Sequence, residues 1–563
     1  MIYKNFDEKD MERLSEQQKT EISDITINPI TRLDYPDPDV IRVSDIYYMV
    51  STTMHFMPGG EILRSYDLVN WEHAAFVYDH LDSTPGQRLE GAQNIYGKGM
   101  WAASLRFNRG VFYVCFVAND TGKTYLYTSE SIAGPWKKQQ IAGFYHDCSL
   151  LFDGDDVYIA YGNKDIYITQ LNADLTAPLV GGLHRLAVSD VGHPGLGYEG
   201  THFYKINGKY YLFFIHSLRD RWMRTEACFM ADSIDGAFIG GDVLVDDRGY
   251  CGQGVAQGGI VDTPDGKWYA VLFQDHGAVG RIPVLVPVTW DAEYPVFGKD
   301  RRIPQQFEVP LPYKRADYKY ESLVQSDDFR KVLGLSKEKE CERYGCYGLK
   351  SVWQFNHEPD LRLVRQDTES GILWIETGKV CQSLLQAANV LTQRMFFPRC
   401  TGDVTVDAST LKVGDYAGLC ALQGCYGMVA VTRRNDGFYI VMKSRTAEND
   451  SMQAPEKVVE GTEWETVRIK QSTVRLRIEA DFAQMKDEAK FFYYDGEYNS
   501  EYDDNSDSRH NGEYRWKPIG IAQKLYFKLD HFAGCRFGLF VYATKEIGGK
   551  GGFSRFRYDA VVE

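Results

Sequence analysis

Short apolar runs separated by turn residues dominate the first half of the chain. From Asn28 to about Gly298, aromatic and β-branched residues gather in brief runs that alternate with Gly, Asp and Asn. Runs of this length bounded by turn formers are typical of β-strands. The polar residues 1–27 lack this pattern and are predicted to form an N-terminal extension with at most a turn or two of helix.

Five of these runs resemble one another and recur along the chain. Their aromatic markers are Tyr47, Phe112, Tyr158, Tyr210 and Trp268. The intervals between the markers are 65, 46, 52 and 58 residues. A turn followed by an aromatic residue comes after several of the runs and ends at Trp71, Trp136 and Phe238. A repeat of strand, strand, turn and aromatic residue at this period predicts a five-bladed β-propeller, here over residues 28–306.

The pattern changes after a connector at residues 307–325. From Gly348 onward new alternating runs follow, namely LWIET, DVTVDAS, FYIVMK, VRLRIEA, KFFYYDG and RFGLFVYAT. Alternation with a period of two predicts half-buried strands of a two-sheet sandwich, which we assign to residues 326–563. The predicted fold class is therefore all-β, a five-bladed propeller followed by a jelly-roll, concanavalin-like β-sandwich.

Composition narrows the class of partner. The chain has 563 residues and a net charge of −15, with a pI near 5.4, which excludes nucleic acid and anionic membranes as electrostatic partners. Aromatic residues make up 14% of the chain and suit stacking on sugars or other flat ligands. No run approaches the ~20 apolar residues of a membrane span, and the charged N-terminus lacks the apolar core of a signal peptide. We therefore expect a soluble, cytoplasmic protein.

Cysteines and acidic runs give little sign of a metal site. Two C-x4-C pairs, Cys341/Cys346 and Cys420/Cys425, lack the second ligand pair of a zinc site. We expect the 11 cysteines to be reduced and mostly buried. The acidic run from Ser500 to Ser508 is predicted to be a solvated loop, and a calcium site there stays an open alternative.

One position upstream of each aromatic marker stands out. In a propeller the first strand of each blade runs along the central axis, and its start opens onto a funnel. The position lies ten residues before the first marker and eleven before each of the others. Its residues are Asp37, Trp101, Asp147, Glu199 and Gln257. If the blades are equivalent, these five residues form a ring around the axis.

Three members of this ring are carboxylic acids, which are seldom buried together without a task. Like charges at close range raise at least one pKa, so a protonated acid can stand beside an ionised base. Glycoside hydrolysis needs that pair, and Trp101 offers a platform for a sugar face. Taken one at a time, each acid has a structural alternative. Asp37 could form a turn, Asp147 could cap a turn and Glu199 could pair with an arginine. The shared register favours a functional ring, with a metal site of the three acids as the competing interpretation.

Several motifs of the chain together resemble those of a known enzyme family. They are YPDPD, SYDLVNWE, WAASLR, HDCSLLFDGDD, YEGTHFYKINGKYYLFF and QGGIVDTPDGKWYAVLFQDHGAVGRIPVLVPVTW. The chain resembles glycoside hydrolase family 43, five-bladed propeller enzymes that remove arabinofuranosyl or xylosyl residues with inversion. The segment from WQFNHEPD to GLCALQGCYG resembles the sandwich domain appended to xylosidase-like members.

This resemblance implies roles for matching residues. Asp37 would be the general base that activates water and Glu199 the general acid. Asp147 would tune the pKa and orientation of the acid. Arg281, in GRIP, would reach the sugar and the acids, with a surface salt bridge as the alternative. Phe532, in HFAG, resembles a sandwich-domain aromatic residue that closes the pocket of related xylosidases.

One departure from the family concerns a metal. Many members place a histidine near the axis in the fifth blade, often beside a calcium ion, where this chain has Gln257. His276 is then the candidate metal ligand, and a purely structural histidine is its alternative. We expect no required cofactor, and a structural calcium ion on the propeller axis is left open.

These features predict an exo-acting, inverting glycosidase that releases terminal α-L-arabinofuranosyl, and also β-D-xylosyl, residues from arabinoxylan- or arabinan-derived oligosaccharides. Inversion requires the two catalytic carboxyls to be ~6.5–9.5 Å apart. The alternatives are a β-D-xylosidase acting on xylo-oligosaccharides and a non-catalytic carbohydrate-binding propeller. A sialidase is disfavoured because the Ser-x-Asp-x-Gly-x-x-Trp boxes are missing. The oligosaccharide is the expected partner, and a homo-oligomer is compatible with the sequence.

Overall fold

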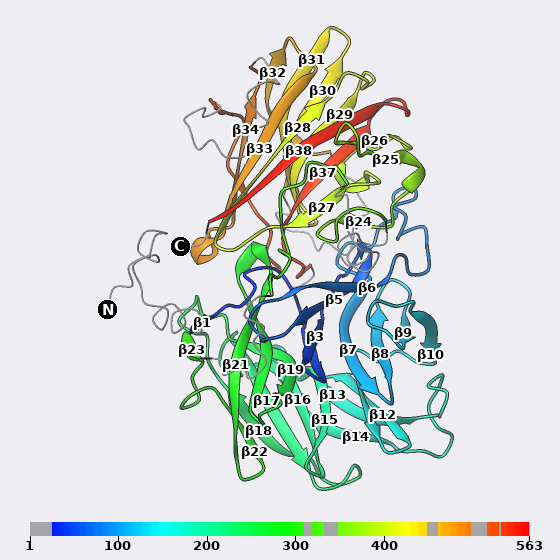
Figure 1. Ribbon diagram of the computed structural model, residues 1–563, viewed down its shortest axis with the longest axis vertical. Coiled ribbons are helices and arrows are strands. Elements are labelled where there is room, and N and C mark those ends of the chain that lie inside the picture. The colour runs from blue at the N-terminus through cyan, green and yellow to red at the C-terminus, as the bar shows by residue number, and fades with distance from the viewer. Residues whose placement is uncertain are drawn as a thin grey trace.

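The protein is described by a computed structural model that covers residues 25–308, 318–331, 347–446, 460–496, 515–528 and 531–561. Figure 1 shows two β-rich bodies, a propeller below in blue to green and a sandwich above, mostly in yellow to red. Helix is confined, in these ranges, to the short 3-10 turns η1 (Gly277–Val279), η2 (Leu361–Leu363), η3 (Leu384–Gln386) and η4 (Ala483–Met485). None of them is long and apolar enough to cross a membrane.

Five four-stranded antiparallel sheets form the blades of the propeller. Blade one comprises β2 (Asp39–Val43), β3 (Ile46–Val50), β5 (Gly59–Ser65) and β6 (Glu72–Tyr78). Blade two comprises β7 (Met100–Asn108), β8 (Val111–Ala118), β9 (Lys123–Ser129) and β10 (Lys137–Ile141). Blade three comprises β11 (Ser149–Asp153), β12 (Asp156–Asn163), β13 (Asp165–Leu171) and β14 (His184–Ser189). Blade four comprises β15 (Glu199–Ile206), β16 (Lys209–Ser217), β17 (Arg224–Ala231) and β18 (Ile239–Leu244). Blade five comprises β19 (Ala256–Asp262), β20 (Trp268–Asp275), β21 (Arg281–Asp291) and β22 (Tyr294–Phe297).

Each aromatic marker of the sequence repeat lies on the second strand of its blade, which confirms the prediction of five blades. Strand β16 shows why these runs are almost continuously apolar. Tyr211 and Phe213 pack into the core shared with blade five, while Leu212 and Phe214 pack toward blade three. Side chains of a strand alternate between its faces, so a strand buried on both faces needs apolar residues at every position.

The ring of blades is closed by side chains between blades one and five. Each of these blades takes its four strands from one continuous stretch of chain. Arg42 of β2 forms an ion pair with Asp262 of β19 at 2.5 Å. The Asn28 amide donates to the carbonyl of Leu285 at 2.8 Å and accepts from its N–H at 2.9 Å. Close by along the chain, β1 (Ile25–Ile27) pairs with β23 (Gln306–Glu308).

A buried polar network joins the inner strands of four blades. Arg106 of β7 donates to Asp39 of β2 at 2.7 Å and to Ser149 of β11 at 2.7 Å. The ring of His202, on β15, lies 3.1 Å from the same Asp39 carboxylate. Burial alone would raise the pKa of Asp39, but Arg106 and His202 hold it below its ordinary value. Because each strand contributes a charged or polar group to one network, the blades are fixed relative to one another at the centre.

The second body is a sandwich of two sheets. The first sheet contains β32 (Thr462–Ile469), β31 (Gly437–Arg445), β30 (Tyr426–Arg434), β29 (Asp415–Leu422), β37 (Arg536–Ala543), β27 (Leu391–Arg394), β24 (Gln354–Asn356) and β4 (Phe56–Met57). The second contains β25 (Val364–Asp367), β26 (Ile372–Glu376), β38 (Lys550–Val561), β28 (Arg399–Asp407), β33 (Thr473–Asp481), β34 (Glu488–Tyr494) and β35 (Lys517–Pro518), with β36 (Gln523–Lys524) beside β34. Alternating apolar residues of both sheets fill the core between them.

One strand belongs to both bodies. Strand β4 lies within the first blade's stretch of sequence, yet it pairs with β24 and completes the first sheet of the sandwich. Two buried arginines of the sandwich reinforce this junction. Arg394 forms an ion pair with Glu61 at 2.7 Å, and the guanidinium of Arg536 lies over the ring of Phe56. The two bodies are therefore joined by backbone hydrogen bonds as well as by side chains.

Some predictions fall on residues outside the described ranges. These are most of the N-terminal extension, the middle of the 307–325 connector, the pair Cys341/Cys346 and the acidic run at 500–508. The domain limits stay predictions of the sequence. The cysteines of the described ranges are free thiols, and all of them except Cys251 are buried.

Candidate active site

Three of the five ring positions predicted from the repeat share a local backbone feature. Asp37, Asp147 and Gln257 all have positive φ, of 52°, 47° and 56°. Glu199 is followed by Gly200 with φ of 64°, inside a bulge of β15. Left-handed backbone is uncommon for residues with a side chain and gathers at functional sites. The same distortion at equivalent positions supports the register that the aromatic markers predicted.

Asp37 is buried and held from two sides. The Thr52 hydroxyl donates to one of its carboxylate oxygens at 2.7 Å. The Arg281 guanidinium donates to the other at 2.6 Å. Prolines on both sides restrict the backbone, which helps to fix the side chain. Two such hydrogen bonds, one of them from a charged guanidinium, fix the orientation of the carboxylate.

Arg281, the first residue of β21, connects the propeller to the sandwich. Its backbone N–H donates to the buried carboxylate of Asp34 at 2.8 Å. The other Asp34 oxygen accepts from the N–H of Gly534 at 2.6 Å, in the sandwich loop that carries Phe532. The Arg281 guanidinium lies 3.9 Å from the centre of the Phe532 ring. Asp34 thus holds both Arg281 and the loop that carries Phe532. Burial raises the pKa of Asp34 to about 6.

Asp147 and Glu199 lie beside a shared histidine. His146 Nε2 is 3.6 Å from an Asp147 oxygen and 4.0 Å from a Glu199 oxygen. Burial raises the pKa of Asp147 to about 6, and the charges of Glu199 and Asp37 add to this effect while His146 opposes it. Burial alone would lower the pKa of His146, but the two carboxyls raise it to about 9. The N–H of Gly200 also donates to Asp147 at 3.1 Å.

Glu199 is the most accessible of the three acids, with 22% of its side chain exposed. The Asn163 amide donates to it at 2.5 Å. It begins β15 and is therefore positioned by the innermost strand of blade four. A partly exposed acid at the edge of a cluster of titratable groups is accessible to a ligand.

Two aromatic rings form an apolar wall beside the acids. The ring of Trp101, on β7, meets that of Phe532 edge-on at 5.6 Å and lies 5.8 Å from the ring of His146. Phe532 packs with Met54, Phe56 and Ala533 in a small apolar cluster. The wall therefore contains one ring from each body. A chain of contacts from Asp37 through Arg281 and this wall to His146 gathers the predicted acids, arginine and aromatic residues at one site.

Gln257 joins the site through Gly200. A side chain at Gly200 would collide with that of Gln257, so only glycine fits between the acid and this neighbour. The Gln257 backbone N–H donates to the fully buried Glu226 at 2.7 Å. Burial raises the pKa of Glu226 well above its ordinary value. A carboxyl group that is neutral there can accept this bond without leaving a buried charge.

His276 lies apart from this cluster, in the turn between β20 and β21. Its ring stacks on Tyr250 at 4.3 Å and meets Phe397 edge-on at 4.5 Å. Burial, together with the charges of the nearby Arg248 and Arg32, lowers the pKa of His276 to about 3. Calcium takes oxygen ligands, and neighbouring guanidinium groups repel a cation, so these surroundings do not fit a calcium ion. A calcium ion on the axis stays a prediction of the sequence.

Several residues of the site were not predicted from the sequence. His146 and Asn163 contact the acids, and Asp34 fixes the arginine and the Phe532 loop. Arg224 and Asp275 form a further buried ion pair at 2.9 Å, next to Arg281. His146 directly precedes Asp147 in HDCS, so an inspection of the neighbours of each ring acid would have found it.

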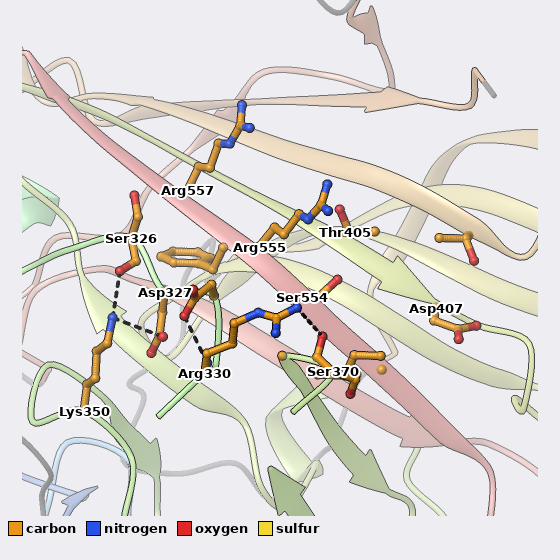
Figure 2. A pocket seen from close by; sticks show the side chains of 16 residues that line it. Ser326, Asp327, Arg330, Lys350, Ser370, Thr405, Asp407, Ser554, Arg555 and Arg557 are labelled. Carbon is orange, nitrogen blue, oxygen red and sulfur yellow. Dashed lines mark hydrogen bonds and ion pairs between the residues drawn. The ribbon is translucent and has the colours of Figure 1, made fainter. Parts of the chain in front are cut away.

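A separate hollow lies on the sandwich (Figure 2). Its volume is about 670 Å³, and it is lined by residues of the sandwich and its preceding segment, among them Arg330, Lys350 and Arg555. Lys350 forms an ion pair with Asp327 at 3.1 Å. None of the predicted acids lines this hollow, and it is not part of the candidate site.

Comparison with known proteins assigns the chain to a family. Residues 26–294 match the model of glycosyl hydrolases family 43, and residues 347–559 match the β-xylosidase C-terminal concanavalin A-like domain. A putative β-xylosidase of Xylanibacter ruminicola is 30% identical over 394 residues, which cover 68% of this chain and 69% of that protein. The chain belongs to glycoside hydrolase family 43. The predicted family and the enzyme class are thereby confirmed.

Other members of glycoside hydrolase family 43 extend the comparison. A non-reducing end α-L-arabinofuranosidase of Bacteroides ovatus is 29% identical, covering 55% of this chain and 60% of that protein. The structure of a bifunctional GH43-CE protein of Bacteroides eggerthii matches with a TM-score of 0.82 and 39% identity, covering 96% of this chain and 64% of that longer chain. An engineered family 43 enzyme, described as both endo-xylanase and exo-arabinofuranosidase, matches with a TM-score of 0.81 and 26% identity, covering 95% and 100% of the two chains.

Proposed function

We propose that this family 43 enzyme is an exo-acting, inverting α-L-arabinofuranosidase that also releases terminal β-D-xylosyl residues. Its substrates would be oligosaccharides derived from arabinoxylan or arabinan. The observation that carries the proposal is the single cluster that joins three carboxyl groups, a buried arginine and an aromatic wall. Paired carboxyl groups with distinct surroundings are what acid–base cleavage of a glycoside needs.

In the proposed mechanism the three acids have different tasks. Glu199 gives its proton to the glycosidic oxygen, and the bond from that oxygen to the anomeric carbon breaks as the alcohol leaves. Asp37 takes a proton from a water molecule, which attacks the anomeric carbon from the opposite face. Arg281 and Thr52 each donate a hydrogen bond to the Asp37 carboxylate and fix its orientation. One atom from each of His146, Asp147 and Glu199 lies within 4.8 Å of those of the other two, so the charges of His146 and Asp147 act directly on the acid.

The propeller and the sandwich each contribute one ring to the aromatic wall, and this supports exo action. Phe532 comes from the sandwich and faces Trp101 of the propeller, so the wall would limit how much of a chain can enter. A β-D-xylosidase acting on xylo-oligosaccharides is the second candidate, favoured by the names of relatives such as that of Xylanibacter ruminicola. The two sugars present similar hydroxyl groups near the reacting carbon, and one pocket can accept both.

The first test compares aryl α-L-arabinofuranoside with aryl β-D-xyloside and follows the anomer formed first by NMR. We expect cleavage of both, faster for the arabinofuranoside, with the released sugar inverted at the anomeric carbon. Faster cleavage of the xyloside would make the enzyme primarily a β-D-xylosidase. A retained anomer would overturn the inverting mechanism. Binding of pentose oligosaccharides without cleavage of either substrate would instead indicate a carbohydrate-binding propeller.

Removal of the sandwich ring tests its place in the pocket. Phe532→Ala is expected to raise KM about tenfold, or ~1.4 kcal/mol, and to change kcat less, because an apolar contact to the sugar is lost while the acids remain. Steady-state kinetics on both aryl glycosides measures the effect. Phe438→Ala, which removes a partly buried sandwich ring on β31, is the matched control and should keep KM within twofold. An equal rise of KM in both variants would show that the loss comes from the fold of the sandwich.

A further inference from the structure

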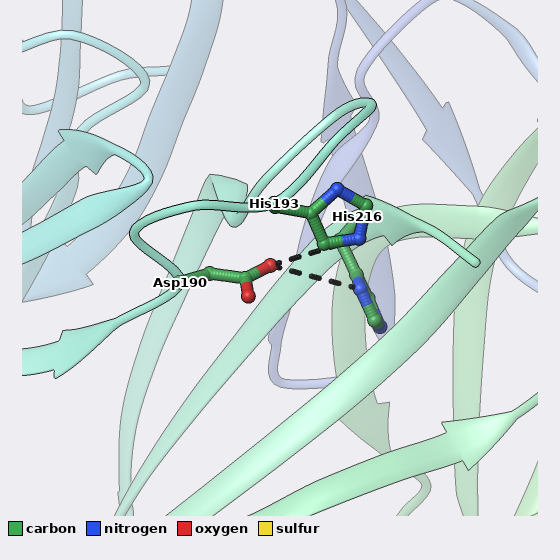
Figure 3. Close-up of side chains that lie close together, drawn as sticks. All are labelled: Asp190, His193 and His216. Carbon is green, nitrogen blue, oxygen red and sulfur yellow. Dashed lines mark ion pairs between the residues drawn. The ribbon is translucent and has the colours of Figure 1, made fainter. Parts of the chain in front are cut away.

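Three side chains outside the proposed mechanism converge at the edge of blades three and four. Asp190 and His193 belong to the turn between β14 and β15, and His216 lies near the end of β16. Their exposed fractions are only 4%, 4% and 7%. One nitrogen or oxygen atom from each lies within 4.8 Å of those of the other two. Figure 3 shows the Asp190 carboxylate facing both imidazole rings.

Two of the atoms that meet there are buried and have no hydrogen-bond partner in the described part of the chain. They are Asp190 Oδ2 and His216 Nδ1, which lie 3.9 Å apart. His193 Nε2 is 4.0 Å from the same Asp190 oxygen. Leaving a buried polar atom unpaired destabilises the folded state, and native proteins avoid it. An oxygen and a nitrogen that face each other across such a gap both suit a bound cation.

The groups around Asp190 and His216 orient these two side chains as a metal site requires. His216 Nε2 lies 2.8 Å from an Asp242 oxygen. A hydrogen bond from Nε2–H to this carboxylate leaves Nδ1 unprotonated, with its lone pair toward Asp190. A carboxylate behind a ligating histidine is the usual outer partner in metal sites. The other Asp190 oxygen accepts from Arg219 at 2.5 Å, which leaves Oδ2 directed at the histidines.

We propose that Asp190, His193 and His216 bind a divalent transition-metal ion of the zinc class. Two atoms that are each about 2.1 Å from one zinc ion are at most about 4.2 Å apart, and the separations of 3.9 and 4.0 Å lie within this limit. Two imidazole nitrogens and one carboxylate oxygen suit zinc, nickel or cobalt. Calcium and magnesium prefer all-oxygen surroundings and do not fit this set.

His193 must give up two hydrogen bonds to take part, the one that its Nδ1 accepts and the one that its Nε2 donates. Its Nδ1 now accepts from the N–H of Gly195 at 3.0 Å, and its Nε2 lies 2.9 Å from the carbonyl of Ser217. As a metal ligand through Nε2, the neutral ring carries its one proton on Nδ1 instead. Gly195 is exposed, so its N–H can bond to water when the turn adjusts. This change leaves the charge of the ring unchanged.

A bound ion would hold the turn that leads into Glu199. The ring of Tyr198, the residue before the acid, packs on His216 with centres 5.0 Å apart. The N–H of Ser217 donates to the carbonyl of Leu196 at 2.9 Å. An ion that joins Asp190 to His216 therefore fixes both ends of the turn. We expect it to raise the melting temperature.

The test uses the full chain, stripped of metal with a chelator and then titrated with Zn²⁺ by calorimetry and metal analysis. Asp190→Asn and His216→Gln, two near-isosteric variants, should each bind one equivalent fewer than the wild type and lose the Zn²⁺-dependent rise in melting temperature. Asp242→Asn should keep the ion with an affinity lowered about 10–100-fold. Ca²⁺ should not compete for this equivalent.

His146→Gln is the control for zinc at the acid cluster, because His146, Asp147 and Glu199 also lie within ligand distance of one another. This variant should retain the equivalent that His216→Gln loses. The proposal is overturned if the wild type takes up no Zn²⁺, or if the stoichiometry falls in His146→Gln but not in the Asp190 and His216 variants. Because zinc uptake is measured without substrate, the result does not depend on the proposed glycosidase activity.

Discussion

The Glu199→Gln variant is expected to lose about 10²–10⁴-fold in kcat/KM on oligosaccharides, whose leaving groups need a proton. Glutamine keeps the size of the side chain and can still pair with Asn163, but it has no acidic proton to give. Measuring kcat/KM on a pentose oligosaccharide and on aryl glycosides of graded leaving-group acidity checks this result. A dinitrophenyl glycoside should recover most of the wild-type rate, because that leaving group departs without protonation.

Asp37→Asn provides the matched contrast. It removes the base that activates water, so its loss should be similar for good and poor leaving groups. Asparagine also keeps hydrogen-bonding atoms for Thr52 and Arg281, which limits the change in geometry. If the two variants respond identically to the leaving group, the assignment of acid and base to these residues is wrong.

His276→Phe is expected to stabilise the protein, increasingly so at acid pH. Both ring nitrogens of His276 are buried without hydrogen-bond partners among the described residues. Phenylalanine would keep the ring contacts with Tyr250 and Phe397 and remove two unpaired polar atoms. Removing them is expected to raise the free energy of unfolding by about 1–3 kcal/mol.

The pH dependence follows from the lowered pKa. His276 has a pKa of about 3 in the folded protein and 6.5 as its ordinary value. Between these values the unfolded chain binds a proton that the folded protein does not. The free energy of unfolding therefore falls by up to ~1.4 kcal/mol for each pH unit below 6.5 on account of this residue. The His276→Phe variant has no histidine to titrate at this position and does not lose this stability. The difference in the free energy of unfolding between variant and wild type should therefore grow by up to that amount for each pH unit below 6.5.

Urea unfolding at pH 7.5, 6.0 and 5.0 measures the difference between the two proteins. Comparing variant with wild type cancels other titrating groups, such as Asp34 and Asp147, whose raised pKa values act in the opposite direction. His80→Gln, at an exposed histidine, should keep the wild-type dependence. A difference that stays constant over this range would contradict the prediction, and a loss of stability would favour a ligand role for His276.

The repeat made much of the site predictable from sequence. Because each blade begins with an inner strand at a fixed distance from its aromatic marker, counting back from Tyr47, Tyr158 and Tyr210 reaches the three acids. Arg281 and Phe532 lie outside that repeat, and only the family resemblance pointed to them. Their contact joins positions 251 residues apart, which no local pattern encodes.

Other features depend on contacts that local patterns do not encode. Asn163 ends β12 and reaches Glu199 only because blades three and four stand side by side. The pairing of β4 with β24 joins segments about 300 residues apart. In the sequence, Phe56 and Met57 are a short apolar pair within a turn-rich stretch, too brief to predict a strand. Such long-range partners are set by the packing of whole sheets.

That shared strand limits how the protein can be recombined with its relatives. A chimera that exchanges the sandwich for another must carry a matching Phe56–Met57 segment in the propeller, because these residues form the edge of the exchanged sheet. The same transplant would replace the ring at Phe532 and the Gly534 N–H that Asp34 holds. Shuffling of domains in this architecture would therefore alter the pocket wall and the scaffold together, and substrate preference would be inherited with the partner domain.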